Sequence, residues 1–360
     1  MIVLVVVILI IVGGVLAATM RDTGETSEEE GQLDVGFSIG DFSNPWRRQH
    51  MDVIESEMQA ENIVDDYNIT AAGSSATDQA SDIRSLADQG MDLIIINPES
   101  SDALNPAIEY AHNQGATVVT TDQHVTSEYA TNVIIDQERW FADQTEWLCE
   151  QLDGEGNIVV INGYPGVPAN EARKDGTEKV LENYPDINVL ETIEGRWQKD
   201  KVQNDYAAVI AEHGGDIDGV LAQDGMMQGV HWAYEEAGIN YEDPEYPGVM
   251  TGDHTMRYLR TYWTDLKDAG IKNYMRANPP GYYAQSSLQV GLRLAQGENL
   301  DTTHEDVDTN TYPANTVWLP LGPAITNQNV DNFIEEFEFK PDGYRIDTRM
   351  TDEEAEEYFE

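Results

Sequence analysis

Residues 91–122, MDLIIINPESSDALNPAIEYAHNQGATVVTTD, decide the fold. The stretch holds an apolar run that stops at Asn97, a segment with helical spacing of apolar residues that stops at Gly115, and a second apolar run that stops at Asp122. A strand, a helix and a strand in this order form the unit of a parallel α/β sheet, because parallel strands need a long crossover connection. The carboxyl ends of such strands meet at one edge, where ligands bind in open α/β sheets.

The same unit recurs in the second half of the chain. Apolar runs at 219–223 and 248–252 stop at Asp224 and Asp253, and helix-like stretches follow. Two successive series of alternating strands and helices predict an α/β fold with two doubly wound, Rossmann-like parallel-sheet lobes joined by a hinge. In a protein of this type the ligand site is expected in the cleft between the lobes.

The length of 360 residues is enough for two lobes with their own cores. We expect residues 33–135 and 279–315 to form the N-terminal lobe, and residues 136–278 and 316–336 to form the C-terminal lobe. Residues 337–360 remain as an acidic tail.

The N-terminus carries an uninterrupted apolar run, residues 2–18, which Arg21 ends. Its length lies between that of a signal-peptide core and that of a membrane span. The residues that follow are acidic and polar, which is typical of a disordered tether. We interpret residues 1–20 as a signal or membrane-anchor segment and residues 21–32 as an acidic tether. This places the lobes at the extracellular face of the cytoplasmic membrane, either anchored or secreted.

The charge balance is extreme, with 67 acidic against 20 basic residues and a net charge of -47. Nucleic acid is excluded as a partner, because phosphate binding requires clustered Lys and Arg. The acidic residues spread over the whole length, and Lys is scarce. This pattern favours a solvated acidic surface in a salty environment, where screening removes the self-repulsion. We infer a halophilic organism.

No motif for catalysis, metal or cofactor binding fits its required context. The sequence from Gly36 through Ser38 to Gly40 matches the G-x-S-x-G pattern of serine hydrolases, but the next helix cannot begin before about Asn44. The chain has no P-loop and no complete dinucleotide fingerprint, and its seven His lack metal-ligand spacing. One cysteine, Cys149, allows neither an internal disulfide nor a zinc site. We expect a protein that is not an enzyme, with no metal and no cofactor.

Polar and aromatic side chains gather at equivalent strand ends in both halves. Trp46 and Arg47 follow the first expected strand, Arg173 opens a helix, and Trp197 follows a strand of the second half. Carboxylates and amides accept hydrogen bonds, Arg donates them, and Trp faces stack on flat apolar surfaces. Together these groups suit a sugar, which has hydroxyl groups at its rim and C–H faces above and below.

Over residues 33–332 the chain resembles the type I periplasmic sugar-binding proteins of ABC importers, in the ribose, xylose and galactose group. Any one matching segment is weak, but the ordered set is specific. The segments are VGFSIGDFSNPWR (35–47), DLIIINPESSDAL (92–104), VVTTD (118–122), NEARKDG (170–176), GVLAQDGMMQGV (219–230), GVMTGD (248–253) and RANPPGYYAQ (276–285).

The resemblance implies a monomeric protein that closes on a monosaccharide between its lobes and delivers it to an ABC permease and its ATPase. It implies that Trp46 and Trp197 sandwich the sugar ring, while carboxylates accept and guanidinium groups donate hydrogen bonds. The implied ligand-binding residues are Asn44, Trp46, Arg47, Asn97, Asp122, Gln123, Arg173, Trp197, Asp224, Asp253 and Asn278.

Three positions depart from the family pattern. Gln123 stands where Arg is frequent, Arg47 where a second aromatic residue is frequent, and Asp224 where Asn is usual. These departures leave a sugar as the expected ligand and count against ribose itself. Two other classes stay open, a ligand sensor for a receptor or kinase and a hydrolase with Ser38 as nucleophile. A DNA-binding repressor of the same fold is excluded by the N-terminal apolar segment and by the net charge.

Overall fold

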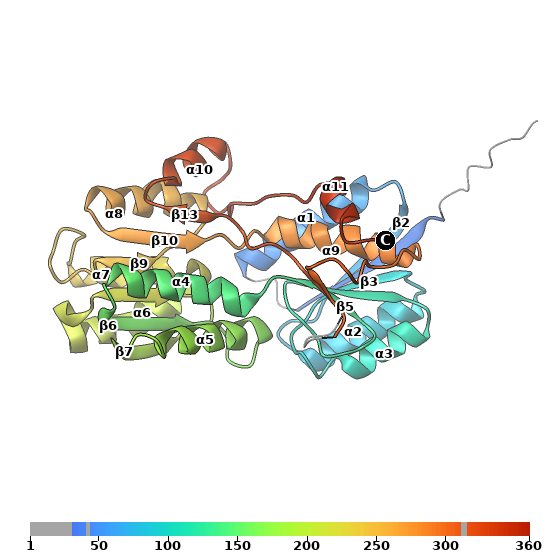
Figure 1. Ribbon diagram of the computed structural model, residues 1–360, viewed down its shortest axis with the longest axis horizontal. Coiled ribbons are helices and arrows are strands. Elements are labelled where there is room, and N and C mark those ends of the chain that lie inside the picture. Colours follow the sequence, from blue (N-terminus) through green and yellow to red (C-terminus); the bar gives the residue numbers. More distant parts are fainter. Residues whose placement is uncertain (1–30, 41–43, 311–314) are drawn as a thin grey trace, which may run out of the picture. The chain divides into compact units, whose positions relative to one another are not determined.

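A computed structural model describes residues 31–40, 44–310 and 315–360, and the part from Gln32 to Glu360 forms one compact unit (Figure 1). The expected signal or anchor segment and nearly all of the tether lie outside the described residues. Among the helices that are described, none has both the length and the apolar character needed to span a bilayer.

The first lobe contains a seven-stranded sheet with the order β11-β12-β5-β4-β3-β1-β2. All neighbouring strands are parallel except β11 and β12. The strands are β1 Leu33–Ile39, β2 Val64–Ala71, β3 Leu93–Asn97, β4 Thr117–Thr121, β5 Thr131–Ile134, β11 Val307–Asp308 and β12 Thr316–Trp318.

Helices cover both faces of this sheet (Figure 1). α1 Pro45–Ala60 packs beside α9 Pro280–Ala295 on one face, and α2 Ala76–Asp88 packs beside α3 Asn105–Asn113 on the other. The expected start of α1 is observed, because Asn44 Oδ1 accepts a 2.7 Å hydrogen bond from the Trp46 amide and Pro45 occupies the first helical position.

The second lobe repeats this design with a six-stranded sheet of order β13-β10-β9-β8-β6-β7, in which only β13 is antiparallel to its neighbour. Helices α4 and α5 cover one face, and α6 and α7 pack together against the other. The strands are β6 Glu155–Asn162, β7 Asp186–Glu194, β8 Gly219–Ala222, β9 Val249–Thr251, β10 Lys272–Arg276 and β13 Ala324–Thr326. The helices are α4 Gln137–Gln151, α5 Pro168–Leu181, α6 Lys199–His213, α7 Met227–Ala237, the π-helical turn Tyr258–Trp263, α8 Thr264–Asp268 and α10 Val330–Glu336.

Both sheets place their first strand between the second and the third, which is the doubly wound order. The predicted fold class is therefore confirmed. The central strand β3 is buried along its whole length, as expected for a parallel strand covered on both faces. Helices α3 and α7 end at the expected glycines. Gly115 and Gly238 adopt φ of 103° and 76°, in a region that glycine occupies more easily than other residues.

The chain passes between the lobes after β5, after β10 and after β12. The third passage corrects one detail of the expected division, which assigned residues 316–336 to the second lobe. β12 instead pairs in parallel with β5, Val317 beside Val133, and so belongs to the first sheet. A strand of three residues carries no local signal for its partner, because strand pairing depends on side chains that are distant in the sequence.

The acidic tail, residues 337–360, packs on the body of the protein. Ile346, Met350, Ala355 and Tyr358 are buried, and α11 Asp352–Glu356 contacts α9. The tail therefore forms a fourth passage between the lobes.

Candidate ligand-binding site

Nine of the eleven predicted site residues line one small cavity of about 30 Å³, here called the central cavity. The other two, Asn97 and Asp253, do not line it; both are fully buried. Ala169 is the one lining residue that was not predicted. The nine are Asn44, Trp46, Arg47, Asp122, Gln123, Arg173, Trp197, Asp224 and Asn278.

The central cavity lies where strand ends of the two lobes meet. Asp122 follows β4 of the first lobe, and Asp224 follows β8 of the second. Arg173 comes from α5, and Asn278 lies in the passage between β10 and α9. This is the position at which open parallel sheets bind ligands.

The backbone is strained at the same place. Asp122, Arg196, Trp197 and Asp224 adopt φ of 65°, 55°, 51° and 53°, in the left-handed region that non-glycine residues seldom occupy. Such conformations cost of order 1–3 kcal/mol each and cluster at functional sites. The strain therefore supports a functional role for the two aspartates and for Trp197.

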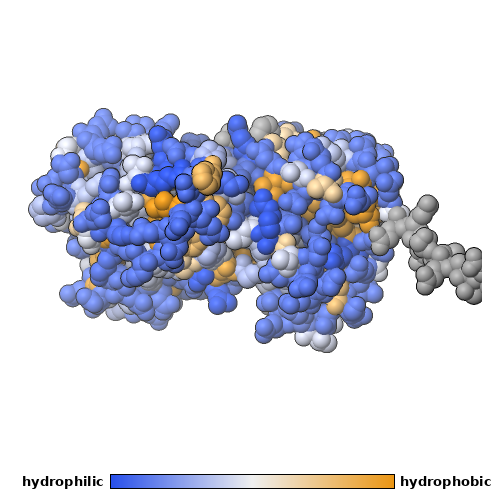
Figure 2. All heavy atoms as spheres, turned by 90° about the horizontal axis from the view of Figure 1, so that it is seen from above, coloured by the Kyte–Doolittle hydropathy of each residue, from blue (hydrophilic) through white to orange (hydrophobic). Residues whose placement is uncertain are grey.

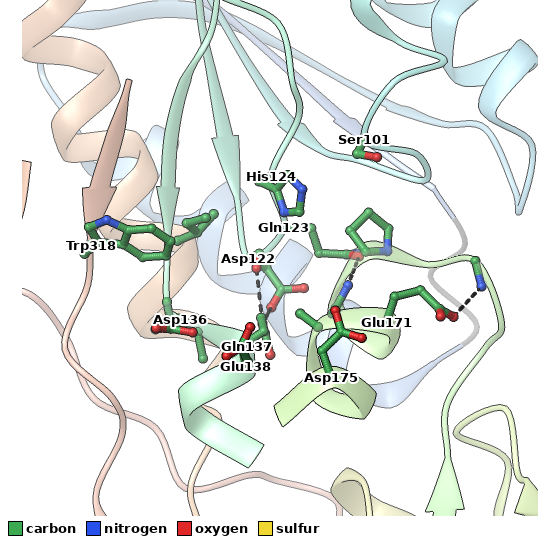
Figure 3. A pocket seen from close by; sticks show the side chains of 16 residues that line it. Ser101, Asp122, Gln123, His124, Asp136, Gln137, Glu138, Glu171, Asp175 and Trp318 are labelled. Carbon is green, nitrogen blue, oxygen red and sulfur yellow. Dashed lines mark hydrogen bonds between the residues drawn. The ribbon is translucent and has the colours of Figure 1, made fainter. Parts of the chain in front are cut away.

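A hydrogen-bonded bridge links the lobes beside the cavity through Gln137, which the sequence did not single out. Its Nε2 donates to Asp122 Oδ1 over 3.1 Å (Figure 3). Its Oε1 accepts from Arg173 Nε over 2.9 Å. Gln137 begins α4 directly after the first passage. Gln137 can form this bridge only because the fold brings Asp122 and Arg173 to either side of it. The local sequence around Gln137 therefore does not predict its role.

Burial dominates the electrostatics of Asp122 and Arg173. It raises the pKa of Asp122 to about 6, against the opposing charges of Arg173 and Arg47. Burial likewise lowers the pKa of Arg173, while Asp224 and Asp122 act to raise it. The Arg173 guanidinium also lies 4.4 Å from the ring centre of Trp140, a cation–π contact that holds it in place.

Asp224 is held ionised by its surroundings. Burial would raise its pKa, but His254, Arg345 and Arg173 outweigh that effect and lower it. Asp224 Oδ1 lies 3.5 Å from His254 Nε2. Among the described residues, Asp224, Asp253 and His254 are close enough to share a metal ion. Because the Arg345 guanidinium already supplies positive charge there, we assign no metal to them.

Arg345 is the second residue that the sequence did not identify. It is 4% exposed, and its guanidinium lies against the loop that carries Asp224. A Cβ atom on Gly225 would stand 3.5 Å from Arg345 Nη2 and 3.2 Å from Asp253 Oδ2. Arg345 is one of two Arg residues in the acidic tail, no sequence pattern marks it, and only the tertiary contacts bring it here.

Each predicted aromatic residue is fixed on its own lobe. Trp46 is buried, stacks on His50 with ring centres 5.2 Å apart, and donates from Nε1 to the Asn278 carbonyl over 2.7 Å. Trp197 is half-buried and rests on Gly163, where any Cβ would overlap its indole ring. Both rings can present an apolar face to a ligand without losing these contacts.

Buried polar atoms without hydrogen-bond partners gather at the cavity. Of the lining residues, Trp197 Nε1 is such a donor, and Asp224 Oδ1 and Asn278 Oδ1 are such acceptors. Buried polar groups are nearly always paired, and an unpaired one costs about 1–3 kcal/mol. A ligand that both donates and accepts, as hydroxyl groups do, would satisfy them.

A larger pocket of about 470 Å³ adjoins the central cavity and shares Asp122, Gln123 and Ala169 with it (Figure 3). Four acidic side chains of the second lobe line it, namely Asp136, Glu138, Glu171 and Asp175, and Asp122 adds one from the first lobe. Two further pockets, of about 380 and 250 Å³, lie on the side of Trp197 and Tyr164. The central cavity therefore shares lining residues with recesses on more than one side.

The serine of the hydrolase motif does not sit on an exposed turn. Ser38 is fully buried near the carboxyl end of β1, where it pairs with Thr70 and Ile96 of the neighbouring strands. A nucleophile elbow needs its Ser exposed on a sharp turn between a strand and a helix. The position of Ser38 disfavours the hydrolase alternative.

The sequence matches the family model of the periplasmic binding protein domain over residues 35–299. It is 29% identical over 324 residues to a xylitol-binding protein of Mycolicibacterium smegmatis, which covers 89% of this chain and 84% of that protein. It is 26% identical over 152 residues to the ribose import binding protein RbsB of Bacillus subtilis, covering 42% and 49% of the two chains.

Solved structures show the same fold. An ABC transporter solute binding protein from Thermobispora bispora superimposes with a TM-score of 0.76 at 24% identity, over 90% of this chain and 94% of that one. A solute binding protein from Bacillus halodurans with bound myo-inositol superimposes with a TM-score of 0.69 at 16% identity, over 86% and 100%.

Proposed function

The chain belongs to the periplasmic binding protein domain family, and from this premise we propose that it captures a monosaccharide or a sugar alcohol in the central cavity for an ABC importer. The observation that carries the proposal is a set of unpaired polar atoms around one cavity, namely Trp197 Nε1 and Asp224 Oδ1 of the second lobe and Asn278 Oδ1 of the passage after β10. Hydroxyl groups supply the matching donors and acceptors.

The proposed roles follow from the geometry of the side chains. Asp122 and Asp224 accept hydrogen bonds from hydroxyl groups of the ligand, and Arg173 donates to its oxygen atoms. Trp46 and Trp197 cover the two apolar faces of the ligand. Arg47 is paired with Glu99, so it acts mainly by its charge beside the first-lobe carboxylate Asp122.

Binding and release require movement of the lobes. The central cavity of about 30 Å³ has room for only one or two water molecules, far less than a sugar needs. The lobes must therefore separate to admit the ligand and stay slightly further apart around it. Contacts to both lobes favour the closed state, which is the state that a permease would recognise.

The remaining elements of the proposal concern the setting of the protein. Residues 1–20 act as a signal or a membrane anchor, and the two lobes work as a monomer outside the cell with a permease and its ATPase. The protein comes from a halophile and is not an enzyme. The acidic composition and the largely hydrophilic surface support the halophilic setting (Figure 2).

The proposal is tested by thermal shift and calorimetry in molar salt, with xylitol, D-ribose, D-xylose, D-galactose and myo-inositol as probes. A ligand that binds only the folded state raises the melting temperature. For the compound that does so, Trp197→Ala should weaken binding about 10- to 100-fold, because it removes one apolar face and one donor.

Trp232→Ala is the matched control, since Trp232 is half-buried in α7 and lines none of the pockets around the site. It should leave the affinity within about twofold. If none of the five compounds raises the melting temperature, or if both variants weaken binding equally, the proposed site is wrong.

A further inference from the structure

The C-terminal segment 342–358, here called the C-terminal strap, connects both lobes directly. Its first residues pair with the second lobe through one isolated antiparallel bridge. The Met256 amide donates to the Tyr344 carbonyl over 2.8 Å, and the Ile346 amide donates to the His254 carbonyl over 3.0 Å. Thr255 and Arg345 lie opposite each other in this pairing. The strap is thus bound to the segment that directly follows Asp253.

The next residues of the strap are bound to the first lobe. Asp347 Oδ1 accepts from the amides of Gly281 and Tyr282 over 2.9 and 3.1 Å, at the start of α9. A Cβ on Gly281 would overlap the Asp347 carboxylate and the Arg349 guanidinium, so the absence of a side chain at Gly281 permits this approach. The passage between the lobes therefore falls between Ile346 and Asp347.

Gln49 of α1 fastens the strap at this passage. Its Oε1 accepts from the Arg345 amide over 3.0 Å, and its Nε2 donates to the Arg345 carbonyl over 3.2 Å. The same Nε2 lies 3.1 Å from Asp347 Oδ2. The Gln49 side chain of the first lobe thus binds both the amide and the carbonyl of Arg345, which itself pairs with the second lobe.

The side chain of Arg345 points from the strap to the carboxylates of the second lobe. It is buried, and its Nε and Nη1 donate no hydrogen bond to any residue that the structure describes. Nη2 lies beside Gly225, the residue directly after Asp224, where it would be 3.5 Å from a Cβ atom. The other charged or titratable groups that act on Asp224 are His254, Arg173, Asp122 and Lys199.

We propose that Arg345 is a positioning residue whose buried charge stabilises the neighbouring Asp224 carboxylate, and that the strap is a fourth hinge connection which Gln49 fastens when the lobes close. The side chain of Arg345 acts through Asp224, because it does not line the central cavity. The inference deepens the proposed function of the same site, but its first test needs no ligand.

The first test is a double-mutant cycle on stability, with Arg345→Met and Asp224→Asn alone and together. Arg345→Met removes the charge that compensates a buried carboxylate, so it should raise the equilibrium constant of unfolding about tenfold or more when Asp224 is present. In the Asp224→Asn background the same substitution should change it by less than about threefold. Equal effects in both backgrounds would overturn the positioning role. Arg345→Lys, which keeps the charge, should fold even where Arg345→Met does not.

The second test uses the probe compound that raises the melting temperature most. Arg345→Met should weaken its binding about tenfold or more, and Arg345→Lys should restore most of the loss, since a charge rather than a shape is required. The exposed Arg257→Met, on the segment paired with the strap, is the matched control and should leave affinity unchanged. If Arg257→Met weakens binding as much, or Arg345→Lys restores nothing, the role of Arg345 is wrong.

The third test concerns closure. Gln49→Met removes the amide that fastens the strap, and X-ray scattering of the ligand-free protein should show a larger radius of gyration than for the wild type. The control Gln59→Met, exposed on the same helix, should leave it unchanged. An unchanged radius for Gln49→Met would overturn the fastening role. If no probe compound binds while the stability cycle shows coupling, the proposed function fails and the positioning role stands.

Discussion

Asp122 is the residue at which burial and charge oppose each other most directly. It follows β4, adopts a left-handed backbone, and is 7% exposed. Burial raises its pKa to about 6 from an ordinary value of 3.8, although Arg173 and Arg47 lie near it. The folded protein therefore binds this proton more tightly than the unfolded chain does.

The pH dependence of stability follows from this shift. The stabilising contribution of Asp122 is complete below about pH 3.8 and is lost as the pH rises through about 6, where the buried carboxylate ionises. Relative to the wild type, Asp122→Asn should gain stability between pH 4 and pH 7 by up to about 3 kcal/mol. Denaturant unfolding of both proteins at pH 4, 5, 6 and 7, without ligand, measures this difference.

Asp52→Asn controls for the loss of one negative charge, since Asp52 is exposed on α1. A difference between Asp122→Asn and the wild type that stays constant over this pH range would contradict the assignment.

At the scale of single elements, the contribution of a central strand to the free energy of unfolding depends on the burial of both its faces. Ile95 of β3 has no exposed surface, and its neighbours in β1 and β4 are Phe37 and Val119. Each apolar residue of such a strand contributes stability by its transfer from water and by close packing.

Truncation within β3 should therefore be costly. Ile95→Ala should destabilise the protein by about 2–5 kcal/mol, because it leaves a cavity that the surrounding sheet cannot fill. Val189→Ala in β7, where the side chain is 36% exposed, should cost well under half as much. Equilibrium unfolding in urea compares the two, and equal losses would show that β3 is not packed as described.

Short elements are harder to predict from the sequence than long ones. β3, α7 and α9 carry enough apolar periodicity to be predicted from the sequence, because their own residues determine their type. β11, β12 and β13 have only two or three residues each, so their partners depend on distant strands. The position of β12 in the first sheet is the clearest example.

At the scale of the whole molecule, negative charge dominates the surface. With 67 acidic and 20 basic residues, most carboxylates have no basic side chain to pair with. The face in Figure 2 is mainly hydrophilic, and among the described residues only Val189 and Phe339 are large exposed apolar side chains. Repulsion among these charges opposes the compact state unless salt screens it.

Stability should accordingly increase with ionic strength. The Debye length falls from about 10 Å at 0.1 M to about 3 Å at 1 M salt. The melting temperature should rise by roughly 5–10 °C over this interval, which corresponds to a few kcal/mol. Thermal melts in NaCl measure the effect, with equal osmolality of sucrose as the control. A rise that sucrose reproduces fully would point to solvent exclusion and contradict the screening explanation.

Much of this protein is determined by the sequence itself. Apolar runs and helical spacing specify the order of strands and helices, because these patterns report which face of each element is buried. The polar residues at strand ends are also visible in the sequence, and nine of eleven expected site residues line one cavity. That they bind a ligand stays a prediction.

Only the tertiary structure decided which distant groups meet. Gln137 joins Asp122 to Arg173 across the hinge, the strap brings Arg345 over Gly225, and Asp253 lies outside the lining of the central cavity. The physical reason is that hydrogen bonds and charges act between groups that are close in space, whether or not these groups are close in the sequence. Local sequence determines the conformation of an element, whereas the partners of its side chains depend on packing between lobes.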